Sequence, residues 1–195
     1  IGIDEVGRGP IAGPLVVCAC AVHVGINILK LFPREELRDS KKLTEMKRAA
    51  IMDQLPKYIE EGVIIFGIGE VSAERLDQIG LSAAITEALT AALAKVHAQE
   101  VPKNSFIFLD GSLKADKIYP QETIIKGDEK IPEIALASII AKTHRDAYMK
   151  KISELYPLYG FEKHVGYGTK AHYEAIKEKG VTSLHRKTFL KGLLV

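Results

Sequence analysis

An apolar run near the start of the chain sets the strongest limit on how it can fold. Residues 13–24, GPLVVCACAVHV, are rich in valine and offer apolar side chains on both faces of an extended strand. A strand that is apolar on both faces has to be covered on both sides, as a central strand of an α/β protein is. The run therefore predicts a sheet with helices packed against both faces.

Further strand and helix patterns follow this run in an order that fits the same architecture. The other expected strands are residues 1–4, 62–71, 105–110 and 122–128. The expected helices are residues 43–61, with Thr44 as N-cap, 81–97, 131–156, with Pro132 in its first turn, and 170–179. We predict an α/β fold with a mixed sheet flanked by helices and a small helical C-terminal extension.

The composition supports a folded domain and gives no sign of membrane insertion. Hydrophobic residues make up 47% of the 195 residues, and no apolar run approaches the roughly 18 residues needed to span a bilayer. Cys18 and Cys20 stand two apart on one strand, a poor arrangement for a disulfide, so we expect buried thiols in a reducing cytoplasm. We therefore expect a cytoplasmic monomer with no membrane partner.

Charge is unevenly distributed along the chain. Residues 141–195 contain 11 Lys and Arg against 5 Asp and Glu, which gives +6, and the total of +2 leaves −4 for residues 1–140. An acidic part beside a basic part fits a metal site next to a surface that binds a polyanion. The alternative is that the basic residues form an ordinary solvated face of a helix. The charge distribution taken alone favours this second interpretation.

Acidic residues stand at or just after the carboxyl ends of the predicted strands. Asp4, Asp110 and Asp128 occupy such positions, and Glu5 follows Asp4 directly. Ligands of open α/β sheets bind at these strand ends. Several carboxylates brought together repel one another unless a cation intervenes, and oxygen ligands suit Mg²⁺ or Mn²⁺. The pattern predicts a metal site, although a single Asp at a strand end is also a common turn residue.

The adjacent pair Asp4 and Glu5 poses a geometric problem, because neighbouring residues on a regular strand point to opposite faces. Both can face one metal site if the strand ends at Asp4 and the chain turns towards Gly7. We predict this turn. The alternative is that Glu5 lies on the other face and pairs with a nearby lysine.

The segment Gly7-Arg8-Gly9 has two interpretations. The glycines either permit a turn between two strands, with Arg8 in solvent, or they let backbone N–H and C=O groups approach a ligand closely. A backbone donor and acceptor together match a ribose 2′-hydroxyl, which is both acceptor and donor.

Two basic segments are candidates for nucleic-acid contact. DSKKLTEMKR (39–48) places lysines near a helix start, where phosphate binds well, although an ordinary basic surface turn is the alternative. GFEKHVGYGTK (160–170) places Tyr167 among lysines, as in stacking sites for bases or sugars. Tyr167 packed on the core is the alternative there.

Taken together, the segments resemble bacterial ribonuclease HII, a type 2 ribonuclease H family. GIDEVGRGPIAGPLV, DSKKLTEMKR, FLDGS, KGDEKIPEIALASIIAKTHRD, YGFEKHVGYGTKAHYEAI and HRKTF are similar to that family's motifs and occur in the same order over nearly the whole chain. The resemblance implies a ribonuclease H-like fold with a five-stranded mixed sheet. It also implies cleavage of RNA in RNA–DNA hybrids, and on the 5′ side of single ribonucleotides in duplex DNA, leaving a 3′-hydroxyl and a 5′-phosphate.

The resemblance further implies roles for individual residues. Asp4, Glu5, Asp110 and Asp128 match the four carboxylates that bind two Mg²⁺ or Mn²⁺ ions; the fourth position falls to Asp128 and not to Asp146 of the HRD motif. The 2′-hydroxyl-recognising loop matches Gly7, Arg8 and Gly9, and the tyrosine that packs on the sugar matches Tyr167. Backbone-phosphate contacts are implied for a further set: Ser40, Lys41, Lys42, Ser138, Lys142 and Arg145.

The resemblance also suggests a division of the chain and one departure from the family pattern. Residues 1–150 correspond to the catalytic domain and residues 151–195 to a helical extension that contributes to substrate binding. Gly80 stands where the family usually has Asn, so a duplex contact there is expected to be weakened or moved.

Two other functions remain open from the sequence. Another nuclease of the same broad fold, such as a DNA exonuclease, would not require a ribose at the cut site. A non-catalytic nucleic-acid-binding module would use the acidic residues structurally and would bind no Mn²⁺.

Overall fold

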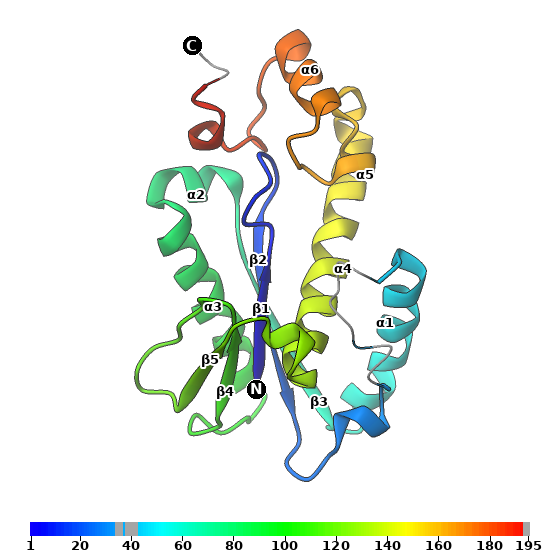
Figure 1. Ribbon diagram of the computed structural model, residues 1–195, viewed down its shortest axis with the longest axis vertical. Helices are drawn as coiled ribbons and strands as arrows, with labels where there is room; N and C mark the ends of the chain where they lie inside the picture. Colours follow the sequence, from blue (N-terminus) through cyan, green and yellow to red (C-terminus); the bar gives the residue numbers. More distant parts are fainter. Residues whose placement is uncertain (34–36, 38–42, 193–195) are drawn as a thin grey trace.

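The computed structural model describes residues 1–33, 37 and 43–192 (Figure 1). The predicted phosphate contacts Ser40, Lys41 and Lys42 lie outside the described residues. No helix in the described ranges combines the length and the apolar character needed to cross a bilayer.

A five-stranded mixed sheet forms the centre of the protein, with strand order β3-β2-β1-β4-β5. The strands are β1 (Gly2–Val6), β2 (Leu15–Val22), β3 (Ile64–Val71), β4 (Ile107–Asp110) and β5 (Gln121–Ile124). β1 pairs antiparallel with β2 and parallel with β4, while β2–β3 is antiparallel and β4–β5 parallel. This order places β1, which carries the first two acidic residues, in the middle of the sheet.

Helices cover both faces of the sheet, as the apolar run of β2 predicts (Figure 1). The α-helices are α1 (Glu45–Glu60), α2 (Ala73–Ile79), α3 (Leu81–His97), α4 (Pro132–Leu155), α5 (Phe161–His164) and α6 (Lys170–Lys179). Short 3-10 helices are η1 (Ile28–Lys30), η2 (Gly127–Glu129), η3 (Pro157–Tyr159) and η4 (Lys187–Leu190). Alternate β2 side chains pack into two separate cores: Val16, Cys18 and Cys20 with α1 and α4, and Leu15, Val17 and Ala19 with α3.

Most predicted elements are confirmed. Thr44 caps α1 by accepting the Lys47 N–H, and α3 has the predicted bounds. Helix α2 was not predicted. It is separated from α3 only by Gly80, whose backbone (φ 80°, ψ 161°) belongs to a region open essentially to glycine alone.

The residues after α4 form a small unit with its own apolar cluster. Tyr159, Phe161, Ile176 and Leu190 pack against Met149 of α4 and against residues 11–12, which belong to the turn between β1 and β2. The β1–β2 turn and the C-terminal segment therefore lie at the same end of the molecule (Figure 1). This end is also the carboxyl end of β1.

Candidate active site

The parallel register of β1 and β4 brings two of the predicted acids together. Ile3 pairs with Leu109 in this ladder, so Asp4 and Asp110 occupy the next pair of positions, on strands that lie about 4.8 Å apart. Asp4 is 6% exposed and accepts a hydrogen bond from Ser138 of α4. Asp110 is the last residue of β4, where the sequence predicted it, whereas Asp4 lies beside it two residues before the end of β1.

The predicted strand end at Asp4 is wrong. β1 continues to Val6, because Glu5 and Val6 remain in the antiparallel ladder opposite Val17 and Val16. Glu5 also has a different partner from the lysine of the alternative interpretation. Its Oε1 accepts a hydrogen bond from Arg8 Nη1 at 3.0 Å. Its Oε2 is buried and has no hydrogen-bond partner in the described part of the chain.

The electrostatics of this site favour a bound cation. Burial raises the pKa of Asp4 well above its ordinary value, and the negative charges of Glu5 and Asp110 raise it further, against the hydrogen bond from Ser138. Burial also raises the pKa of Glu5, and Asp110 adds to this, although Arg8 opposes it. Asp4 and Glu5, whose pKa values are raised, become stable as carboxylates when a divalent cation neutralises them.

Asp128 reaches this region by a route that the sequence did not predict. β5 ends at Ile124, and Asp128 lies on η2, which packs against α4. The backbone N–H of Gly127, the residue before it, donates to Asp110 Oδ1 at 2.6 Å. A 3-10 turn, and not the end of a buried strand, therefore connects Asp128 to the other acids.

The donor set fits a hard divalent cation. Its atoms are carboxylate oxygens, which Mg²⁺ and Mn²⁺ prefer, and the unpartnered Oε2 of Glu5 is a buried acceptor with no proton donor. Within the described ranges, no three Asp, Glu, His or Cys side chains already form a metal-binding arrangement. The acids share one end of the sheet, and ligation requires their side chains to turn towards a common ion.

The Gly-Arg-Gly loop (residues 7–9) leaves β1 through a tight turn. Gly7 has φ +90°, and a Cβ there would lie 2.6 Å from the Pro14 carbonyl oxygen and from Arg145 Nε. Arg8 and Gly9 are exposed. The Cε1 atom of Tyr167 lies 3.9 Å from the position of a Cβ on Gly9, and Tyr167 is 40% exposed. The loop and Tyr167, 158 positions apart, thus form one surface beside the acids.

Arg145 has a different role from the predicted phosphate contact. It is fully buried, and its guanidinium donates to the carbonyls of Ala12, Pro14 and Val165 at 3.0, 2.9 and 2.9 Å. Burial lowers the pKa of Arg145. A guanidinium enclosed in this way has no surface to offer a phosphate, so the expectation is corrected: Arg145 holds the β1–β2 turn against the segment before Tyr167. Ser138 is likewise buried and supports Asp4.

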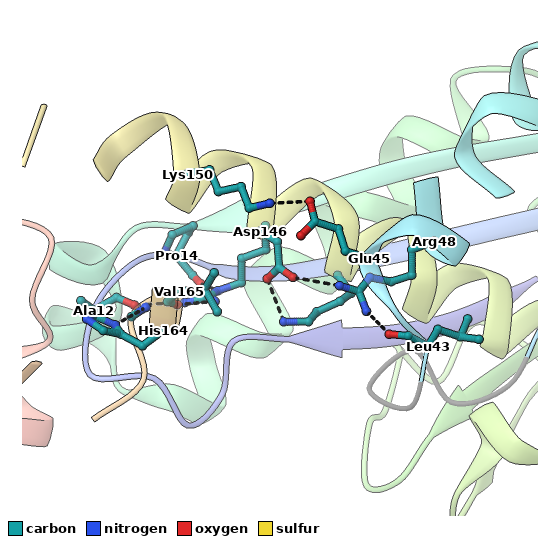
Figure 2. A network of polar contacts seen from close by, with 12 residues as sticks. Ala12, Pro14, Leu43, Glu45, Arg48, Asp146, Lys150, His164 and Val165 are labelled. Atoms are coloured by element: carbon teal, nitrogen blue, oxygen red, sulfur yellow. Dashed lines mark hydrogen bonds and ion pairs between the residues drawn. The ribbon is translucent and has the colours of Figure 1, made fainter. Parts of the chain in front are cut away.

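Asp146 of α4 and Arg48 of α1 lie in a polar network that joins the two helices (Figure 2), and Lys142 is bonded to this network. Its Nζ donates to Asp146 Oδ1 at 2.8 Å, and Asp146 Oδ2 accepts from Arg48 at 3.4 Å. Arg48 also donates to the Leu43 carbonyl, next to the basic segment 39–42. Lys142 lies one helical turn after Ser138, so the network holds a cation close to the acids.

Two buried histidines, which no sequence pattern predicted, support the backbone of Tyr167. His172 Nδ1 donates to the Tyr167 carbonyl at 2.9 Å, which leaves its Nε2 as an acceptor. His185 Nδ1 accepts the Thr182 N–H, so its Nε2 carries the proton and donates to His172 Nε2 at 3.2 Å. A search for i, i+4 histidine pairs misses this contact, which joins positions 13 apart through tertiary folding.

Acid should unfold the protein partly through these histidines. Burial lowers the pKa of both His172 and His185 to about 4 from 6.5. The folded state keeps them neutral while the unfolded chain takes up protons, so their contribution to stability is complete above pH 6.5 and is lost as the pH falls towards 4. We expect protonation of the two histidines to lower the unfolding free energy of the protein by roughly 2 kcal/mol or more over this range.

Urea unfolding of wild type and of His172→Asn at pH 7, 6 and 5 measures this contribution. An asparagine amide can replace Nδ1–H as the donor to Tyr167 but does not titrate. The variant should therefore lose less stability between pH 7 and 5 than wild type does, and an equal loss in both proteins would contradict the assignment.

Comparison with known proteins identifies the family. A family model described as Ribonuclease HII matches residues 1–192. The chain belongs to the ribonuclease HII family. A ribonuclease HII is a metal-dependent endonuclease that cuts the RNA strand of RNA–DNA hybrids and ribonucleotides embedded in DNA.

Individual ribonucleases HII and solved structures agree with this assignment. The Chlamydia abortus protein is 45% identical over 188 residues, which are 96% of this chain and 82% of that protein. The Fusobacterium nucleatum protein is 44% identical over 198 residues, 100% of this chain and 86% of that protein. The fold matches RNase HII in its PCNA complex from Archaeoglobus fulgidus, with a TM-score of 0.72, 27% identity, and coverage of 95% of this chain and 92% of that chain. The predicted ribonuclease H-like fold is confirmed.

Proposed function

We propose that Asp4, Glu5, Asp110 and Asp128 bind two Mg²⁺ or Mn²⁺ ions and that cleavage falls on the 5′ side of a ribonucleotide, leaving a 3′-hydroxyl and a 5′-phosphate. One observation carries the proposal: the register of β1 and β4 sets Asp4 beside Asp110, and Glu5, the next residue, is bonded to Arg8 of the Gly-Arg-Gly loop. Divalent ions bound by such carboxylates supply an activated water and stabilise the leaving oxygen in phosphodiester hydrolysis.

The protein's own residues set the geometry of this site. Ser138 holds Asp4 by a hydrogen bond, and the Gly127 N–H holds Asp110. Arg8 holds one oxygen of Glu5 and leaves the other free for a cation. These bonds keep the carboxylates near one another, and in our proposal they turn towards the ions as ligands and do not carry protons.

Recognition of the sugar falls to the Gly-Arg-Gly loop and Tyr167. The exposed backbone of residues 8–9 offers polar groups to a 2′-hydroxyl, and the Tyr167 ring beside Gly9 offers a flat surface to the sugar. A DNA junction lacks the hydroxyl, so the polar groups built to meet it stay unpaired and the substrate is rejected.

Contacts with the nucleic-acid backbone would come from Lys142 and, by family resemblance, from Ser40, Lys41 and Lys42. The extension, residues 151–195, is proposed to bind substrate because it carries Tyr167 and because residues 141–195 have a net charge of +6. We propose that the protein acts as a monomer on RNA–DNA hybrids and on ribonucleotide-containing duplexes.

A duplex with one ribonucleotide tests this function directly. In Mg²⁺ or Mn²⁺ we expect a single cut on the 5′ side of the ribonucleotide, mapped by a denaturing gel against size standards, with a 3′-hydroxyl that a polymerase can extend. The same duplex with a deoxyribonucleotide at that position should be cut at a rate lower by a factor of about 10⁴ or more, because the site is built to meet a hydroxyl. Equal cleavage of both duplexes would indicate a general DNA nuclease instead.

A further inference from the structure

Arg186 is a buried arginine bonded to two points of the β1–β2 turn. It is fully buried, its Nη1 donates to the Arg8 carbonyl at 3.2 Å, and its Nε and Nη2 donate to the Gly13 carbonyl at 3.1 and 2.8 Å. Arg8 and Gly13 are the two ends of the segment that carries Gly9. One guanidinium therefore fixes both ends of this segment.

The bond to the Arg8 carbonyl also fixes the direction of the next N–H. All peptide bonds of the described chain are trans, and in a trans peptide the C=O and the following N–H point in opposite directions. Because the Arg8 carbonyl points inward to Arg186, the Gly9 N–H points away from the buried guanidinium. Gly9 is exposed, and in the described part of the chain no acceptor takes up this N–H. The N–H is thus directed outward as a free donor beside Tyr167.

The residue before Arg186 reaches the other half of the sugar site. His185 contacts His172, and His172 donates to the Tyr167 carbonyl. The backbone joins in as well: His185 forms a β-bridge with Ala12, and the Arg186 N–H donates to the Ile11 carbonyl at 2.8 Å. Two consecutive residues therefore connect the Gly-Arg-Gly loop to Tyr167 through buried contacts.

The next residues fix this pair to the catalytic domain. Asp77 of α2 accepts the Lys187 N–H at 2.6 Å and the Thr188 N–H at 3.1 Å, and it also bonds the Thr188 hydroxyl. Among the described residues the Arg186 guanidinium hydrogen-bonds to carbonyls and lies 5.3 Å from the centroid of the Phe189 ring, with no carboxylate bonded to it. Burial of a charge without an ion pair is costly, and it lowers the pKa of Arg186 to about 10. Such a cost is consistent with a role in fixing a geometry.

We propose that Arg186, together with His185, is a positioning residue for ribose selection: it directs the Gly9 N–H outward and sets its spacing from Tyr167. The proposal rests on the proposed sugar-recognition role of these groups. Neither residue touches the substrate or the metal ions. Their loss should therefore slow turnover and leave metal binding unchanged.

Two variants and one control test this role. Arg186→Lys keeps the charge but cannot bond both the Arg8 and the Gly13 carbonyls. His185→Asn can still accept the Thr182 N–H, but it has no atom at the Nε2 position to reach His172. Leu89→Ala, in the core between α3 and the sheet, lowers stability by a cavity alone and serves as the matched control.

For each protein, calorimetry of Mn²⁺ binding gives the concentration of active sites that bind metal. Cleavage of the single-ribonucleotide duplex then gives KM, and kcat is calculated per metal-binding active site. We expect Mn²⁺ affinity within about twofold of wild type and kcat/KM per site about 10- to 100-fold lower for Arg186→Lys and His185→Asn, the range for a small misplacement of reacting groups. Leu89→Ala should keep the wild-type value per site.

Values per site within twofold of wild type for either variant would overturn the positioning role, and the two variants are independent should one fail to fold. Failure of the proposed function looks different. In that case wild type itself would not distinguish the ribonucleotide duplex from the all-DNA duplex.

Discussion

We expect Asp4→Asn and Asp110→Asn each to lose cleavage by about two to three orders of magnitude or more, the scale on which a charge-stabilising group acts in an active site. Asp4 is held by Ser138 and lies beside Asp110, so an amide in its place fits the same space but offers a divalent cation no charge. Cleavage of the single-ribonucleotide duplex and heat of Mn²⁺ binding should fall together. Near-normal cleavage by either variant would rule out these ligands.

The Asp4→Asn variant should be more stable than wild type when metal is absent. The pKa of Asp4 is raised in the folded state, so the folded protein holds a proton that the unfolded chain gives up. Unfolding free energy contributed by Asp4 therefore falls as the pH rises from ordinary carboxyl values through the raised pKa. Asparagine removes this loss. Urea unfolding in EDTA at pH 8 should give a larger unfolding free energy for Asp4→Asn than for wild type. Addition of Mn²⁺ should stabilise only wild type.

Asp146→Asn is the matched control for the expected gain in stability of Asp4→Asn. Asp146 also lies in the α4 region, but its carboxylate is paired with Lys142 and Arg48. Loss of that charge should lower stability instead of raising it, and the heat of Mn²⁺ binding should remain. A gain of stability in both variants would mean that the effect of Asp4→Asn does not arise from repulsion within the acidic site.

The sequence predicted the acids but not the path by which each one reaches the site. Asp4 and Asp110 follow from local strand patterns, because parallel neighbours end at the same edge of a sheet. The continued strand at Glu5 depends on pairing with Val17, and the position of Asp128 depends on a 3-10 turn docked on α4. Both are tertiary contacts that no local pattern records.

The buried groups behind the proposed sugar-recognition surface, formed by the Gly-Arg-Gly loop and Tyr167, show the same limit more strongly. Lysine- and arginine-rich segments predict surface contacts with phosphate, yet Arg145 and Arg186 are fully buried and bond to carbonyls of a turn more than 130 positions away. A buried and an exposed arginine look alike in sequence. The family resemblance identified the HRKTF motif, but the contacts of its arginine, Arg186, are seen only in the structure.

The two glycines of the Gly-Arg-Gly loop should respond very differently to alanine. Gly7 has φ +90°, and its Cβ would meet the Pro14 carbonyl and Arg145 at 2.6 Å. Strain at such a backbone and the enforced shift of a buried neighbour together should cost about 3 kcal/mol or more of unfolding free energy. Apart from its own chain neighbours, no atom of the described residues lies closer than 3.9 Å to the Cβ position of Gly9, so Gly9→Ala should change stability by less than about 1 kcal/mol.

Activity separates the two positions in a second way. Gly7→Ala displaces the whole loop, so both stability and turnover should fall. Gly9→Ala keeps the fold, but its methyl group would lie 3.9 Å from Tyr167 Cε1, on the residue whose exposed N–H is proposed to meet the ribose. We expect its kcat/KM on the single-ribonucleotide duplex to fall about tenfold, with Mn²⁺ binding unchanged, because only the fit of the sugar is altered. Normal cleavage by Gly9→Ala would mean that the ribose does not approach the protein at this backbone, and the recognition surface would have to be sought elsewhere around Tyr167.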